Sequence, residues 1–158
     1  MKKHFQIKSE SEADTKNIAK NISHVFKPGD VIILNGDLGA GKTHFVKGFA
    51  EGINSQSIVT SPTFSLANFY KSPGATLLHI DLYRIDTVNE FYDLGLADFF
   101  DQSVTMIEWG TKFEDYIDDY LQITIEITGN NSRIISFESK SDKYSSIIDS
   151  IKEVLTKK

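Results

Sequence analysis

The chain has 158 residues, of which 40% are hydrophobic and 25% are charged, and these proportions are typical of one soluble globular domain. It contains no cysteine, which excludes disulfide bonds, thiolate catalysis and cysteine-ligated zinc, and which fits a reducing cytoplasm. The formal net charge of −5 argues against a broad surface for the phosphate backbone of a nucleic acid.

The sequence also predicts a cytoplasmic protein without membrane contact. No apolar run approaches the roughly 20 residues that are needed to cross a bilayer. The first residues, Met1–Gln6, lack the apolar core of a secretory signal.

The first third of the chain predicts a strand, a helix and a second strand. Phe5–Lys8 alternates apolar and polar residues, which is typical of a short edge strand. Ser9 or Ser11 is placed to cap a helix that continues to about Phe26. Val31–Leu34 is a continuous apolar run, as expected of a strand buried on both faces of a parallel sheet.

The stretch Gly36–Thr43 fits G-x-x-x-x-G-K-[ST], the phosphate-binding loop of nucleotide hydrolases and kinases. Its glycines let backbone N–H groups wrap an anion. Lys42 supplies a positive charge for the β- and γ-phosphates, and Thr43 supplies a hydroxyl for Mg²⁺. We therefore expect a nucleotide and Mg²⁺ to be bound here, at the start of a helix that ends near Gly52. The residues assigned to nucleotide binding in this stretch are Asp37, Leu38, Gly39, Ala40, Gly41, Lys42, Thr43 and His44.

The rest of the chain alternates between strand and helix patterns. The predicted elements are a hydroxyl-rich connector at 57–64, a hairpin of strands at 65–70 and 76–81, a mainly helical segment at 83–100 that Leu94–Leu96 interrupts, a core strand at 104–108, a short acidic segment at 113–120, a hairpin of strands at 121–127 and 133–138, and a closing helix at 144–155. This order predicts one α/β domain over residues 1–158, with a mixed, mainly parallel sheet flanked by helices in a P-loop NTPase fold.

Two carboxylates end apolar strands. Asp81 follows Leu77–Ile80, and Glu108 follows Val104–Ile107. Ligands of open α/β sheets lie at the carboxyl ends of the strands, and Mg²⁺ takes only one or two carboxylates. Either acid alone is better explained as a strand-end cap or a surface acid, but two of them in a nucleotide fold favour metal binding or the positioning of water.

These motifs together resemble the TsaE (YjeE) family, small bacterial ATPases required to make N6-threonylcarbamoyladenosine in tRNA. The resemblance covers nearly the whole chain and rests on the phosphate-binding loop together with Ser61–Phe64, His79–Arg84, Leu94–Leu96 and Glu108–Trp109. Two positions depart from the common pattern: Gly110 follows Trp109, and His44 stands where a second threonine is common.

The resemblance implies a role for each matched position. Thr43 and Glu108 would bind Mg²⁺, and Asp81 would be the Walker-B-like acid of the metal site. Ser11 and Arg133 would border the base. A switch or partner surface would include Ser61, Pro62, Thr63, Phe64, Tyr83, Arg84 and Trp109. The implied partners are TsaD and TsaB, which would hold most of the tRNA.

Several of these residues also have purely structural interpretations. Ser61–Thr63 fits a rigid turn before a strand. His79 is more typical of a satisfied core histidine than of a catalyst. Tyr83 and Arg84 fit a surface salt-bridge group, and Trp109 fits a core anchor.

The predicted function is Mg²⁺-dependent ATP hydrolysis that resets a larger tRNA-modifying assembly. Lys42 would contact the phosphates, and Asp81 would orient a water molecule. With only Arg84 and Arg133 as arginines, we expect slow hydrolysis by the isolated chain and activation by partners.

Three alternatives are a small-molecule kinase, a GTP-binding switch and a nucleotide-dependent interaction protein. Kinases of this kind usually carry several arginines on a lid, and guanine readers carry an Asn-Lys-x-Asp stretch that this sequence lacks. The third alternative remains open, because binding and turnover use the same residues.

Overall fold

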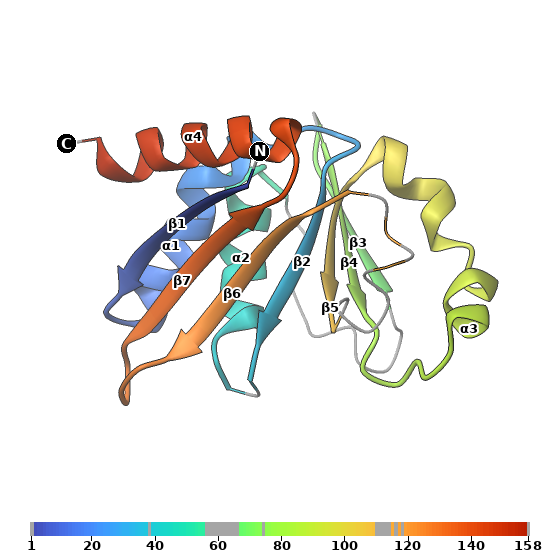
Figure 1. Ribbon diagram of the computed structural model, residues 1–158, viewed down its shortest axis with the longest axis horizontal. Coiled ribbons are helices and arrows are strands. Elements are labelled where there is room, and N and C mark those ends of the chain that lie inside the picture. The colour runs from blue at the N-terminus through green and yellow to red at the C-terminus, as the bar shows by residue number, and fades with distance from the viewer. Residues whose placement is uncertain are drawn as a thin grey trace.

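A seven-stranded sheet with the strand order β1-β7-β6-β2-β5-β4-β3 organises the computed structural model (Figure 1). The structure describes residues 2–37, 39–55, 67–73, 75–109, 115, 117 and 119–157. The strands are β1 (Lys3–Ser9), β2 (Val31–Gly36), β3 (Ala67–Lys71), β4 (Thr76–Asp81), β5 (Val104–Glu108), β6 (Leu121–Ile127) and β7 (Arg133–Ser139). The helices are α1 (Glu12–Ile22), α2 (Lys42–Gly52), α3 (Val88–Asp93) and α4 (Asp142–Thr156), with 3₁₀ helices η1 (Ser23–Val25) and η2 (Leu96–Gln102).

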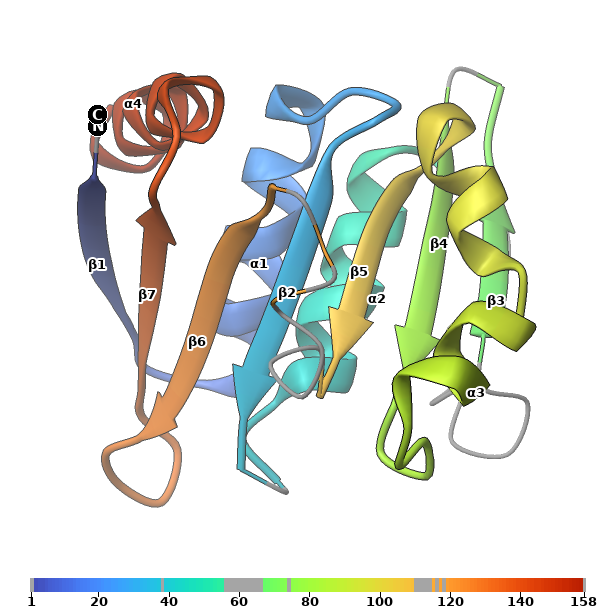
Figure 2. The same cartoon turned by 45° about the vertical axis from the view of Figure 1, so that its right-hand side comes forward.

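The sheet is mixed, and most of its strands run in the same direction. The central pairs β6/β2, β2/β5 and β5/β4 are parallel, whereas β1/β7, β7/β6 and β3/β4 are antiparallel. Only β7 and β3 therefore run against the others, which confirms the predicted fold class. The arrowheads of β6, β2, β5 and β4 all point to the same edge of the sheet (Figure 2). The carboxyl ends of the parallel strands lie there, and a ligand is expected at those ends in such a sheet.

Each face of the sheet has its own apolar core. Helices α1 and α2 lie behind the sheet in Figure 1, and Phe45 and Phe49 of α2 pack there in a cluster that also holds Ile32 of β2. On the opposite face, Ile33 of the same strand belongs to a second cluster with Phe91 of α3. Strand β2 is thus buried on both faces, as its continuous apolar run predicts.

Helices α1 and α2 approach each other closely at Gly48. A Cβ atom on Gly48 would lie 2.0 Å from the backbone oxygen of Lys16 in α1. The ion pair between Lys16 and Glu51, with Nζ and Oε1 2.8 Å apart, joins the two helices a turn further on. The absence of a side chain at Gly48 therefore sets the distance between the helices.

Helix α4 is tied to the start of the strand that leads to the phosphate-binding loop. The hydroxyl of buried Tyr144 accepts a hydrogen bond of 2.8 Å from the backbone N–H of Val31. Ser141 caps the helix by accepting from the N–H of Tyr144. Figure 1 shows α4 running across one end of the sheet, over β1 and β7.

The element boundaries differ in detail from those that the pattern predicts. The first helix ends at Ile22 and continues only as the 3₁₀ helix η1. The predicted interruption of the 83–100 segment at Leu94–Leu96 is confirmed, since α3 and η2 are separated at Gly95, which takes a left-handed conformation with φ of 67°. The connector at 57–64 lies outside the described residues. Among the described helices, none is long and apolar enough to span a membrane.

Candidate nucleotide-binding site

A cavity of about 600 Å³ lies at the carboxyl ends of the parallel strands. The predicted site residues that line it are Ser11, Gly39, Ala40, Gly41, Lys42, Thr43, His44, Asp81, Tyr83, Glu108, Trp109 and Arg133. Glu12, Thr15 and Asn131 also line it and were missed by the sequence patterns. The cavity has the size of a typical small-molecule site.

The loop between β2 and α2 depends on its glycines. Gly39 and Gly41 have φ values of 84° and 106°, a left-handed conformation that side-chain-bearing residues rarely adopt. Gly36 is needed for a different reason, because a Cβ there would lie 2.9 Å from the backbone oxygen of Ile125 in β6. Asp37 accepts a hydrogen bond from the N–H of Ala40 through its backbone oxygen and thereby closes a turn. The loop thus leads directly into the N-terminus of α2, which favours an anion.

Lys42, the first residue of α2, lies against two other site residues. Its Nζ is 3.4 Å from Oε1 of Glu108 and 4.7 Å from the ring centroid of Trp109. Only 8% of Lys42 is exposed. A cation held at this depth beside the helix N-terminus provides strong attraction for a phosphate group.

The two predicted carboxylates lie next to each other. Asp81 and Glu108 are register partners on the parallel strands β4 and β5, and each is 5% exposed. Oδ1 of Asp81 accepts a hydrogen bond of 2.9 Å from the N–H of Tyr83. Burial acts to raise the pKa of Glu108, but the contact with His79 and the ammonium group of Lys42 outweigh it and hold that pKa below its ordinary value. Glu108 is therefore ionised and able to bind a cation.

His79 is buried, as expected of a core histidine, but it is not a satisfied one. Its Nε2 lies 2.6 Å from Oε2 of Glu108, and its Nδ1 has no hydrogen-bond partner among the described residues. Alternation along the strand shows from the sequence that His79 shares a face with Asp81, whereas the contact with Glu108 depends on the register between β4 and β5.

Trp109 follows Glu108 with an unusual backbone conformation. Its φ of 62° is rare for a bulky residue and requires support from the surrounding structure. The ring lies 5.2 Å from that of Tyr83, centroid to centroid, and that tyrosine is 57% exposed. The two aromatic rings together form a rim of the cavity.

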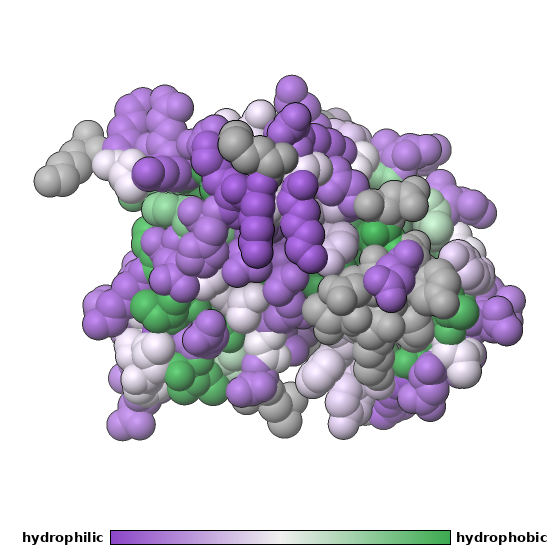
Figure 3. Space-filling view, viewed as in Figure 1, coloured by the Kyte–Doolittle hydropathy of each residue, from purple (hydrophilic) through white to green (hydrophobic). Residues whose placement is uncertain are grey.

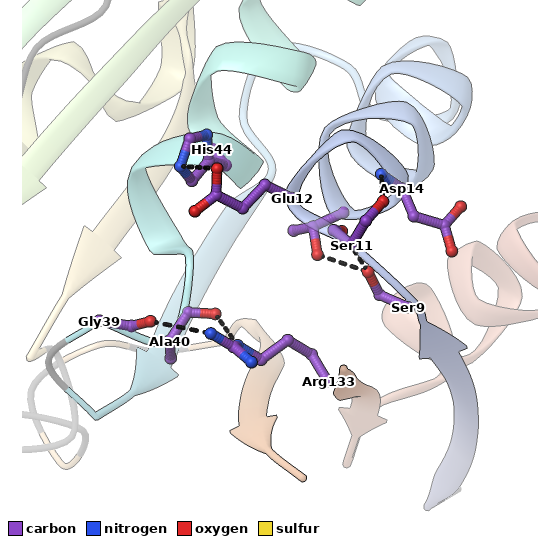
Figure 4. A network of polar contacts seen from close by, with 9 residues as sticks. Ser9, Ser11, Glu12, Asp14, Gly39, Ala40, His44 and Arg133 are labelled. Carbon is purple, nitrogen blue, oxygen red and sulfur yellow. Dashed lines mark hydrogen bonds and ion pairs between the residues drawn. The ribbon is translucent and has the colours of Figure 1, made fainter. Parts of the chain in front are cut away.

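Arg133, the first residue of β7, contacts the backbone of the phosphate-binding loop (Figure 4). Its Nε donates a hydrogen bond of 2.9 Å to the oxygen of Ala40, and one terminal nitrogen donates at 3.2 Å to the oxygen of Gly39. The other terminal nitrogen donates to the backbone oxygens of Gly129 and Ser132 in its own hairpin. The guanidinium group thus joins the β6–β7 hairpin to the loop.

Helix α1 forms another wall of the cavity. Ser11 caps this helix, since its Oγ accepts a hydrogen bond of 3.0 Å from the N–H of Asp14. Glu12 lies 3.4 Å from Nε2 of His44, oxygen to nitrogen, and this contact joins the starts of α1 and α2 (Figure 4). The predicted cap at Ser11 is therefore confirmed.

Some predicted site residues lie elsewhere. Leu38, Ser61, Pro62, Thr63 and Phe64 fall outside the described residues. Asp37 is exposed and lines an adjoining hollow, and exposed Arg84 is not part of the described lining of the main cavity. Within the described part of the chain, no group of three or more His, Cys, Asp or Glu side chains is arranged to hold a metal ion. A metal here would thus depend on one or two carboxylates and a hydroxyl, a donor set that suits Mg²⁺.

Comparisons with known proteins agree with the resemblance that the motifs indicate. The model of the family described as threonylcarbamoyl adenosine biosynthesis protein TsaE matches residues 9–135. A TsaE protein of Bacillus subtilis is 41% identical over 140 residues, which is 87% of each chain. A TsaE protein of Aquifex aeolicus is 38% identical over 83% of this chain and 93% of its own. The crystal structure of YdiB from Bacillus subtilis superposes with a TM-score of 0.83 and 35% identity, and 97% of each chain is covered.

Proposed function

The chain belongs to the TsaE family of threonylcarbamoyl adenosine biosynthesis proteins, and from this premise we propose that it is a Mg²⁺-dependent ATPase. In this proposal it acts with TsaD and TsaB in forming N6-threonylcarbamoyladenosine in tRNA. The names of its relatives support the role in this pathway, and the residues of the cavity support the ATPase activity.

One observation carries the proposal. The phosphate-binding loop, the N-terminus of α2 and two strand-end carboxylates meet in one cavity, although they come from separate parts of the chain. Lys42 lies between the loop and Glu108. A chance match to the loop motif would give no reason for buried acids at the ends of β5 and β4, the next two strands of the sheet beside β2.

The residues divide the work of phosphoryl transfer between them. Lys42 and the N–H groups of the loop bind the phosphates, while Thr43 and Glu108 would hold Mg²⁺. Bound there, the metal ion would neutralise charge that develops on the phosphate oxygens. Asp81 lies beside Glu108 and is placed to accept hydrogen bonds from water.

Lys42→Ala tests the nucleotide site. We expect the affinity for a non-hydrolysable ATP analogue to fall roughly a hundredfold or more, because contacts of a charged donor contribute about 1.5–3 kcal/mol each. Isothermal titration calorimetry measures the affinity, and thermal melting checks that the variant is folded. Lys47→Ala is the matched control, since it removes a lysine from the same helix but outside the described lining of the cavity. Similar affinities in Lys42→Ala and the wild type would refute the site.

A further inference from the structure

The contact between His79 and Glu108 is not explained by the requirements of the apolar core. The His79 side chain has no exposed surface, and its Nε2 lies 2.6 Å from Oε2 of Glu108, within hydrogen-bond distance. In the described part of the chain, Nδ1 meets no hydrogen-bond partner. Burying a polar ring with a nitrogen left unsatisfied costs free energy that an apolar side chain would not. The contact with Glu108 therefore gives a reason for a histidine, rather than an apolar residue, at this position.

The direction of this hydrogen bond follows from the chemistry of the two groups. A carboxylate at neutral pH accepts hydrogen bonds and donates none, so Nε2 of His79 carries the proton and donates it. At 2.6 Å the bond is short, as expected where the acceptor is charged. His79 thus fixes the position of Oε2.

The two oxygens of Glu108 have partners of different kinds. Oε2 contacts His79, which projects from the middle of β4 within the sheet. Oε1 is 3.4 Å from Nζ of Lys42, which ends a long side chain at the phosphate-binding loop. A phosphate that drew Lys42 away would therefore free Oε1 alone, because Oε2 is held by His79.

We propose that His79 is a positioning residue that holds Oε2 of Glu108, so that Oε1 remains directed toward the phosphate-binding loop to receive Mg²⁺. This inference rests on the proposed function, because it assigns the metal to Glu108. Removing a group that orients a metal ligand typically lowers metal affinity 10–100-fold.

Three variants separate positioning from packing. His79→Leu removes the donor and keeps an apolar side chain in the core. His79→Gln keeps an N–H donor on a side chain of similar reach. Thr105→Val is the matched control, because Thr105 is also fully buried in the adjacent strand β5, and its Oγ1 has no hydrogen-bond partner among the described residues.

The measurement is the midpoint of a Mg²⁺ titration of the protein bound to a non-hydrolysable ATP analogue. Trp109 reports it by fluorescence, because it is the chain's single tryptophan and adjoins Glu108. Calorimetry without Mg²⁺ gives the affinity for the analogue itself, and thermal melting verifies folding. We expect the midpoint to rise about tenfold or more in His79→Leu, to recover largely in His79→Gln and to stay unchanged in Thr105→Val. Without Mg²⁺, all four proteins should bind the analogue within about twofold of one another.

A wild-type midpoint in folded His79→Leu would overturn the inference and leave the proposed function intact. An equal loss of analogue affinity with and without Mg²⁺ would also overturn it, because that pattern indicates a general defect of the cavity. If the wild-type protein bound the analogue with no response to Mg²⁺, the metal in the proposed function would fail, and the inference would fail with it.

Discussion

Arg133 lies at the cavity but directs its nitrogens to the protein backbone. The family resemblance places this residue beside the base, and the cavity wall does include it. Its hydrogen bonds nevertheless end on the oxygens of Gly39 and Ala40 and on its own hairpin. These four bonds match the planar fork of a guanidinium group, which presents donors in fixed directions. Arg133 therefore supports the shape of the loop through its backbone.

Arg133→Ala is predicted to lower the affinity for the triphosphate group and to leave the preference between adenine and guanine unchanged. We expect roughly a tenfold loss of affinity, because two hydrogen bonds to the loop disappear at about 1 kcal/mol or less each in net terms. The loss should be equal for an ATP analogue, a GTP analogue and inorganic tripolyphosphate. Competition against a fluorescent nucleotide measures all three affinities.

Two further variants define this prediction. Arg84→Ala changes the chain's other arginine, which is exposed and outside the described lining of the cavity, and it should leave the three affinities unchanged. Arg133→Lys should recover little, since an ammonium group cannot reproduce the fork. A loss of affinity confined to the ATP analogue would contradict the role of Arg133 in supporting the loop. It would instead indicate that Arg133 contacts the base.

The sequence predicted which residues belong to the site better than it predicted which residues they contact. The positions of Lys42, Asp81 and Glu108 follow from local patterns, namely a glycine loop and the ends of apolar strands. The contact of His79 with Glu108 depends on the register between β4 and β5, and that of Arg133 depends on how β7 reaches the loop. Such contacts are tertiary, so no pattern within one segment reveals them.

The same distinction holds for the elements. Both hairpins and the strand before the phosphate-binding loop are local features, and the structure confirms them. The order of the sheet is not local, because β5 inserts between β2 and β4, and β1 pairs with β7 from the other end of the chain. The approach of α1 to α2 is likewise invisible to hydrophobic periodicity, although it brings Ser11 and Thr15 to the cavity.

Gly48→Ala tests the close contact of these two helices. In an isolated helix the substitution would add about 1 kcal/mol of stability, because alanine is the better helix former. Here the new Cβ would lie 2.0 Å from the backbone oxygen of Lys16, so the helices must separate. Overpacking of this kind typically costs 1–3 kcal/mol or more, and we expect a net decrease in the free energy of unfolding.

Urea denaturation measures this free energy, with Lys47→Ala as the control on the same helix. The control should change stability by only about 0.5 kcal/mol, as surface substitutions usually do. Because α1 forms a wall of the cavity, Gly48→Ala should also weaken the binding of an ATP analogue. If Gly48→Ala had the same free energy of unfolding as the wild type, the close contact between α1 and α2 would not contribute to stability.

For the whole molecule, charge limits what the chain can do alone. The 22 acidic side chains outnumber the 17 lysines and arginines, and hydrophilic residues cover most of the face shown in Figure 3. Apolar residues on that face form small separate patches. A net negative charge opposes the binding of tRNA, whose affinity for proteins comes largely from contacts with phosphates. This supports the proposal that the partner proteins hold the tRNA.

The site also has limited means to neutralise charge in a transition state. Among the described residues that line the cavity, Arg133 is the only arginine, and its nitrogens are directed to backbone oxygens. An arginine placed against the transferred phosphoryl group typically raises turnover 10³–10⁵-fold. Lys42 remains as the buried cation beside the loop. Hydrolysis by the isolated chain is therefore expected to be slow.

The last prediction is that TsaD and TsaB together raise ATP turnover by this chain at least tenfold, a conservative fraction of what one added arginine contributes elsewhere. Phosphate release is measured for the chain alone, with the two partners, and with the partners and tRNA. Lys42→Ala in the same mixtures is the control, because it removes this chain's contribution while any ATPase activity of the partners remains. tRNA added without the partners should leave the rate unchanged, since a chain with a net charge of −5 offers it little attraction. Fast turnover by the isolated chain, with no response to TsaD and TsaB, would show that the cavity supplies all the charge that the reaction needs.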